Sequence, residues 1–137
     1  MNTFLPYQDF EKIAKCLDMR RLLKQRVEVY QILLNLSGIK SIFPHHPINK
    51  MWKNSEGLLA EYGIIICDEC LNRGYKDTLM DKIANFACLS TKKPIWWDNS
   101  EIYKCHRQSL LFKNLAWYSQ FGWTEQSIYG YIWPINE

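Results

Sequence analysis

Apolar residues recur every three or four positions through most of this chain, which is the spacing of one face of an α-helix. No segment shows the strict alternation of apolar and polar residues that a half-buried β-strand requires. The 137 residues, 47% of them hydrophobic, are enough for one core and too few for two comfortable domains. The sequence therefore predicts a single compact all-α domain over residues 1–137.

Start and stop signals place the individual helices. Asp9 and Asp18 are suited to cap the first two helices, and Gly74 is a natural stop for a long central helix. The expected helices cover residues 10–17, 19–36, 48–73, 77–89 and about 99–113, with a loop at 38–47 and an irregular aromatic tail at 117–133. The longest apolar runs fall far short of the roughly 20 residues of a membrane span, so we expect no membrane association.

The expected helix at 19–36 has the most unusual charge pattern, because four cations lead to a single carboxylate, Glu28. On a helical period its polar stripe consists of Arg21, Lys24, Gln25, Glu28, Gln31 and Asn35, and its apolar stripe of Leu23, Val27, Tyr30 and Leu34. One interpretation is a solvated face with a Lys24–Glu28 ion pair. The other is a surface that holds a phosphate backbone beside one acid.

The cysteines do not indicate a disulfide framework or a metal site. Their number is five, and Cys67 and Cys70 have a metal-like spacing inside the expected central helix without a second pair. We therefore expect packed free thiols in a reducing cytoplasm, no metal and no cofactor. The signature motifs of phosphate-binding loops, zinc proteases and serine hydrolases are absent.

Histidines and aromatic residues offer further candidates. His46 precedes the central helix, where it could meet a phosphate or an acid, although a surface hydrogen bond is the simpler role. His106, Arg107 and Lys113 could add a second cationic patch or merely a solvated face. Most of the twenty aromatic residues should form the core. The candidates for stacking on bases are Trp52, Trp96 and Trp97.

Several segments together resemble the pyrimidine-dimer DNA glycosylases of the phage endonuclease V type. The similar segments are Arg26 and Glu28 on the early helix, His46 before the long helix, residues 69–75 (Glu-Cys-Leu-Asn-Arg-Gly-Tyr) and residues 117–122 (Trp-Tyr-Ser-Gln-Phe-Gly). The chain is more similar still to small bacterial and phage proteins of that superfamily. These further matches are residues 3–6, 24–28, 46–47, 51–52, 73–75, 106–107 and 133–134.

The resemblance implies a metal-free all-α enzyme that kinks damaged duplex DNA and flips a nucleotide out. In the family an N-terminal α-amine attacks C1′ to form an imine, and a carboxylate on the early helix assists. By match that carboxylate is Glu28. This chain departs from the pattern, since Asn2 stands between Met1 and Thr3 and Phe4 replaces an arginine. Three alternatives follow: the Met1 α-amine attacks, Glu28 activates a water, or catalysis has been lost.

The function expected from these features is a DNA base-excision glycosylase, with or without AP-lyase activity, acting on a damaged or modified pyrimidine. The alternatives are a non-catalytic binder of distorted or modified nucleic acid and an enzyme that processes free modified nucleosides or nucleotides. The expected partner is double-stranded DNA, and a monomer is the expected state. The expected DNA-binding residues are Arg20, Arg21, Lys24, Arg26, His46, His106, Arg107 and Lys113.

Overall fold

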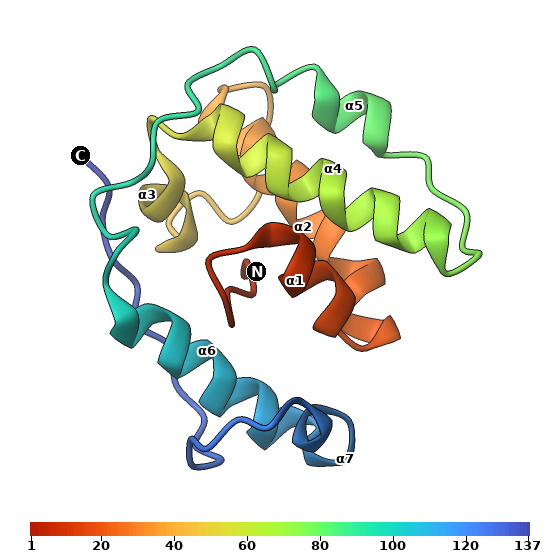
Figure 1. Cartoon of the computed structure of the whole chain (residues 1–137). Helices are drawn as coiled ribbons and strands as arrows, with labels where there is room; N and C mark the ends of the chain where they lie inside the picture. Colours follow the sequence, from red (N-terminus) through yellow and green to blue (C-terminus); the bar gives the residue numbers. More distant parts are fainter.

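The computed structural model describes all residues, 1–137, and contains helices and no strands (Figure 1). The elements are α1 (Phe10–Cys16), α2 (Met19–Leu36), α3 (Ile48–Trp52), α4 (Glu56–Asn72), α5 (Met80–Ala84), α6 (Ser100–Lys113), α7 (Leu115–Tyr118) and the 3₁₀ helix η1 (Ser119–Phe121). The all-α prediction is confirmed. None of the helices combines the length and the apolar character needed to cross a membrane.

Helices α2 and α4 pack against each other at the centre of the fold, and α1 and α5 pack against α4 (Figure 1). Helix α6 lies on the other side of the N-terminal segment. The tail after η1 runs back along α6, where Ser109 Oγ donates to Gly130 O at 2.8 Å and Gly130 N donates to the same hydroxyl at 3.1 Å. Asn136 N donates to Lys50 O at 3.0 Å, which ties the chain end to α3. The two halves of the sequence therefore meet around the N-terminus.

The structure corrects the expected orientation of α2. Its fully buried apolar residues are Leu22, Val29, Ile32 and Leu33, whereas Val27 of the expected apolar stripe is 40% exposed. Gln25 and Glu28, expected on a wet face, are 0% and 7% exposed. Polar residues on a helix have the same spacing whether they face water or hydrogen-bond to buried polar groups, so the sequence pattern could not distinguish the two cases. Helix α2 thus presents two polar side chains to the interior.

The expected central helix at 48–73 is two helices. The break lies at Asn54, whose φ of 66° is a left-handed conformation that asparagine tolerates better than most residues. Asn54 N donates to Glu56 Oε1 at 3.0 Å. The first residue of α4 therefore stabilises the turn that precedes the helix. The predicted stop is confirmed, because Gly74 adopts a φ of 87° and Tyr75 N donates to Cys70 O at 2.9 Å.

Helix α5 is shorter than the predicted 77–89 because the chain turns away to cover the start of α4. Gly57 N donates to Ser90 O at 2.9 Å, which requires a bent backbone after α5. A Cβ at Gly57 would lie 2.1 Å from Leu89 O. Glycine is therefore needed here for a close approach between two backbones.

Gly57→Ala should lower the free energy of unfolding by about 1–3 kcal/mol, since the added methyl forces two backbones apart. The clash outweighs the roughly 0.5–1 kcal/mol that alanine gains over glycine inside a helix. Urea denaturation measures the change. Glu61→Ala, at an exposed position on the same helix, is the control and should stay within about 0.5 kcal/mol of wild type. Equal stability of Gly57→Ala and wild type would contradict this packing.

The predicted base-stacking tryptophans lie in the core. Trp52, Trp96 and Trp97 are 0%, 4% and 9% exposed, and the first two meet edge to face at 5.3 Å. Trp52 Nε1 donates to Thr3 Oγ1 at 2.9 Å, and Trp96 Nε1 donates to Met51 O at 2.9 Å. Their faces are covered by the protein, so the structure corrects their interpretation from stacking platforms to core residues.

Candidate active site

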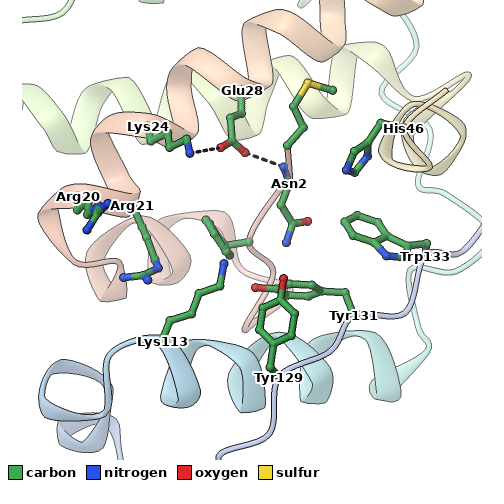
Figure 2. A pocket seen from close by; sticks show the side chains of 12 residues that line it. Asn2, Arg20, Arg21, Lys24, Glu28, His46, Lys113, Tyr129, Tyr131 and Trp133 are labelled. Carbon is green, nitrogen blue, oxygen red and sulfur yellow. Dashed lines mark hydrogen bonds and ion pairs between the residues drawn. The ribbon is translucent and has the colours of Figure 1, made fainter. Parts of the chain in front are cut away.

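A pocket of about 440 Å³ opens where the N-terminus, α2, the loop before α3, the end of α6 and the C-terminal tail converge (Figure 2). Its lining residues are Met1, Asn2, Phe4, Arg20, Arg21, Lys24, Glu28, His46, Lys113, Tyr129, Tyr131 and Trp133. A volume of this size is typical of a site for one small ligand or one nucleotide. Segments from both ends of the sequence therefore line one cavity.

Glu28 is the only acid that lines this pocket. Its Oε2 accepts a hydrogen bond from the main-chain nitrogen of Asn2 at 2.6 Å, and its Oε1 lies 3.8 Å from Lys24 Nζ (Figure 2). The Glu28 side chain is 10% exposed, whereas 74% of the Lys24 side chain is exposed. The acid thus lies between the start of the chain and an exposed cation.

Hydrogen bonds from several helices fix the segment that reaches Glu28. Gln25 Nε2 donates to Asn2 O at 2.7 Å, and Phe4 N donates to Gln25 Oε1 at 2.7 Å. Leu5 N donates to His106 Nδ1 at 3.2 Å. Because donors and acceptors of residues 2–5 are matched by buried side chains, the chain start has one defined position relative to the acid.

Cations gather at the end of the pocket formed by α2 and the last turn of α6 (Figure 2). Arg21 is paired with Asp18 at 3.2 Å, whereas Lys113 Nζ lies 5.3 Å from the centre of the Phe4 ring and has no carboxylate within ion-pair distance. Burial, followed by the positive charge of Arg21, lowers the pKa of Lys113. Mutual repulsion among these side chains favours an anion at this end.

His46 and Trp133 lie at the opposite end, whereas Tyr129 and Tyr131 lie beside Lys113, whose Nζ is 5.6 Å from the centre of each ring (Figure 2). His46 Nδ1 accepts from Ile48 N at 3.1 Å, and the His46 ring meets Trp133 edge to face at 5.1 Å. Burial, followed by the positive charge of the Met1 amino group, lowers the pKa of His46. Near neutral pH this imidazole is therefore uncharged and available as a hydrogen-bond donor at Nε2.

The structure brings seven of the sequence-predicted site residues to the pocket: Met1, Arg20, Arg21, Lys24, Glu28, His46 and Lys113. Others lie elsewhere. Arg26 is bonded to Asp77 at 2.7 Å, and Arg107 is bonded to Glu125 at 2.9 Å, so both cations already have acidic partners. His106 is fully buried, which lowers its pKa to about 3 and keeps the ring neutral. The structure therefore corrects His106 from a DNA contact to a support for the N-terminal segment.

Five lining residues were missed by sequence reasoning: Asn2, Phe4, Tyr129, Tyr131 and Trp133. The tail has no helical period, so no pattern marked which of its aromatic residues face a site. A weak signal existed, since Tyr129 and Tyr131 are spaced to project from the same side of an extended segment.

The cysteines are free, and Cys67 and Cys70 are buried in α4. Burial raises the pKa of Cys67 to about 12, so this thiol remains protonated at neutral pH. No group of three or more histidine, cysteine, aspartate or glutamate side chains is arranged to hold a metal ion. Both thiols are fully buried in the core.

An acid held against a main-chain nitrogen, beside unpaired cations, defines a pocket suited to an anionic substrate. Comparison with family models matches residues 1–83 to the pyrimidine dimer DNA glycosylases. Because the match spans more than half of the chain, this protein belongs to that family. No curated protein and no solved structure matches it. The matched region contains Glu28 and His46 but not α6 or the tail.

Proposed function

We propose that this protein is a DNA glycosylase that removes a damaged or modified pyrimidine from double-stranded DNA, with Glu28 as the catalytic carboxylate. The observation that carries the proposal is the 2.6 Å contact between Glu28 Oε2 and the nitrogen of Asn2, inside a pocket with cations at one end. Membership of the pyrimidine dimer DNA glycosylase family supports the same chemistry. A base inside a duplex is out of reach of such a pocket, so the nucleotide must be flipped out.

In the proposed reaction the C1′–N bond of the flipped nucleotide breaks and the base leaves with the bonding electron pair. Positive charge develops on the sugar, and the Glu28 carboxylate stabilises that charge. A neutral amine forms the new bond to C1′, loses a proton, and gives an imine once the ring oxygen departs. Loss of the C2′ proton and departure of the 3′-phosphate then nick the strand. This β-elimination is the proposed AP-lyase activity.

Two nitrogens near the start of the chain are candidate nucleophiles. Met1 lines the same pocket, and its α-amine lies near enough to His46 to influence that ring. The nitrogen of Asn2 touches Glu28 but is an amide, which is not nucleophilic while Met1 is attached. Removal of Met1 would place an amine 2.6 Å from the acid. Intact-mass measurement of the purified protein distinguishes the two forms.

A non-catalytic binder of distorted DNA is the second candidate, and a specific observation favours it. The nitrogen that touches Glu28 in this chain is part of a peptide bond, so the closest group to the acid cannot attack a sugar. The cationic end would still hold phosphates. Binding without release of any base or strand cleavage is the result that supports this alternative.

The proposal is tested with a duplex that contains one cyclobutane pyrimidine dimer and with the same duplex undamaged. We expect the wild-type protein to cleave the glycosidic bond at the dimer and to leave the undamaged duplex intact. Gel separation after mild alkali detects base loss whether or not the strand is nicked. Abasic duplex and duplexes with single damaged pyrimidines extend the test to other lesions. Absence of reaction with all of them would contradict the proposed activity.

Arg20→Ala should weaken DNA binding and reduce its dependence on salt. Arg20 is exposed, lines the cationic end and has no acidic partner within ion-pair distance, so it is free to neutralise one phosphate. Loss of one phosphate contact makes the slope of log affinity against log salt less steep by about 0.9. Fluorescence anisotropy across a salt series measures the slope. Lys82→Ala, in α5, is the charge-matched control and should leave the slope unchanged.

A further inference from the structure

Three side chains form a hydrogen-bonded group between α7 and the start of α2. The Tyr118 hydroxyl donates to Asp18 Oδ1 and accepts from Asp18 N at 3.2 Å. Asp18 in turn accepts from Arg21 Nη1, at 3.3 Å on Oδ1 and at 3.2 Å on Oδ2. Tyr118 and Asp18 are 0% and 7% exposed, whereas Arg21 lines the pocket (Figure 2). A buried tyrosine is therefore connected to the pocket through one carboxylate and one guanidinium.

Asp18 does not perform the role that its position in the sequence predicts. It is the N-cap residue of α2, but its side chain makes no hydrogen bond to the first turn of that helix. Asp9, the N-cap residue of α1, does cap its helix, since its side chain accepts from Lys12 N at 3.0 Å. Capping by a carboxylate stabilises a helix, and α2 does without it. The Asp18 carboxylate is directed at Tyr118 and Arg21 instead.

Arg21 keeps donors that the protein does not use. Among the arginines that have an acidic partner, Arg26, Arg73 and Arg107 each commit two guanidinium nitrogens to hydrogen bonds within the protein. Arg21 commits only Nη1, so Nε and Nη2 remain available to a ligand. The Arg21 side chain is 19% exposed, against 74% for Lys24 on the same helix. Arg21 therefore offers the pocket free donors on a side chain with a defined position.

The position of Tyr118 is fixed by packing. Its ring stacks on Trp123, with the ring centres 5.6 Å apart and the planes inclined by 10°. Helix α7, which carries Tyr118, is capped by Asn114, whose side chain accepts from Trp117 N at 3.2 Å. Burial, followed by the hydrogen bond to Asp18, raises the pKa of Tyr118, so its hydroxyl keeps a proton to donate at neutral pH. A ring held in the core thus sets the orientation of the Asp18 carboxylate.

We propose that Tyr118 is a positioning residue: through the Asp18 carboxylate it holds the Arg21 guanidinium where the free donors bind a phosphate of the substrate. The inference rests on the proposed glycosylase function and adds a residue of α7, which lies outside the matched residues 1–83. A guanidinium that is already oriented loses less conformational freedom when two of its donors bind a phosphate. Loss of the Tyr118 hydroxyl would let Asp18 turn back to cap α2 and would leave Arg21 free to rotate.

The experiment measures kcat and KM for base removal from the dimer-containing duplex. Tyr118→Phe should raise KM about 5- to 50-fold and change kcat less than about threefold, because a phosphate contact made in both ground and transition states appears in KM. Partial unfolding would instead lower kcat at unchanged KM. Asp18→Asn should raise KM as well, since asparagine still caps a helix but has no charge with which to hold Arg21. Tyr30→Phe, at a half-buried position of α2 away from the pocket, is the matched control and should equal wild type.

Double substitutions test whether Tyr118 acts through Arg21. Tyr118→Phe should not raise KM further in a protein that carries Arg21→Ala, but should have its full effect beside Arg20→Ala, because Arg20 lines the same pocket outside the hydrogen-bonded group. Equal effects of Tyr118→Phe in both backgrounds, an unchanged KM, or a loss in kcat alone would overturn the positioning role and leave the glycosylase function intact. Inactivity of the wild type on every duplex, abasic included, would instead refute the glycosylase function, and the positioning role with it.

Discussion

Glu28→Gln is expected to reduce the rate of base removal about 10²–10⁴-fold, the range for loss of a positioned acid or base. Glutamine keeps the size of the side chain, and its amide oxygen can still accept the hydrogen bond from Asn2 N. It has no charge with which to stabilise a developing cation on the sugar. DNA affinity should be equal to that of wild type or slightly higher, because a negative charge is removed from the pocket that we propose holds phosphates. Single-turnover rates and anisotropy separate the two effects.

The control for this substitution is Glu69→Gln. Glu69 is a partly buried glutamate in α4 that is bonded to Arg73 at 2.8 Å, away from the pocket. Its loss should affect stability slightly and activity not at all. Undiminished base removal by Glu28→Gln would show that the acid is structural, and weaker DNA binding by that variant would show that it contacts the substrate in the ground state.

Gln25→Leu is expected to lower the free energy of unfolding by roughly 2–6 kcal/mol, which is the penalty for two buried polar groups left without partners. The two groups are Asn2 O and Phe4 N, each bonded to Gln25 at 2.7 Å. The substitution also releases the segment that holds the Asn2 nitrogen against Glu28. Activity on an abasic duplex should therefore fall further than the population of unfolded protein explains. Urea denaturation and cleavage assays at low temperature measure the two losses separately.

Gln31→Leu is the matched control, because Gln31 lies on the same helix, is partly exposed and has a side chain that makes no hydrogen bond. It should be as stable as wild type within about 0.5 kcal/mol. Were Gln25→Leu equally stable and fully active, the N-terminal segment would have to be positioned by something other than this buried amide.

The helices that could be predicted well are those with clear signals at both ends. Helix α6 begins after Asn99, whose side chain accepts from Glu101 N, and it ends at Lys113 as expected. The bounds of helix α2 were also predicted correctly, although the side chain of Asp18 makes no capping hydrogen bond and instead pairs with Arg21. The break at Asn54 was not visible, since the apolar spacing continues across it. A single left-handed residue changes the direction of the chain without changing the hydrophobic pattern.

The candidate site was only partly predictable, for a different reason. Glu28 and Lys113 could be named from the sequence, but nothing in it showed that residues 85 positions apart line one pocket. The helical spacing predicts Gln25 on a solvated stripe, whereas the residue is fully buried. A polar residue with buried hydrogen-bond partners has the same spacing in the sequence as a polar residue in water. The positions of Tyr129, Tyr131 and Trp133 depend on contacts between the tail and α6, which are non-local and follow no period. Tertiary packing decided these positions, and local pattern did not.

Borohydride reduction of the protein on an abasic duplex, followed by mass mapping of the cross-linked peptide, tests the central claim most directly. The claim is that a nitrogen at the start of the chain attacks the sugar beside Glu28. We predict one covalent adduct, on the peptide that begins with Met1 or, after its removal, with Asn2. Absence of any adduct would contradict the amine mechanism. An adduct on Lys24 or Lys113 would also contradict the claim, because a lysine side chain and not a nitrogen at the start of the chain would then attack the sugar.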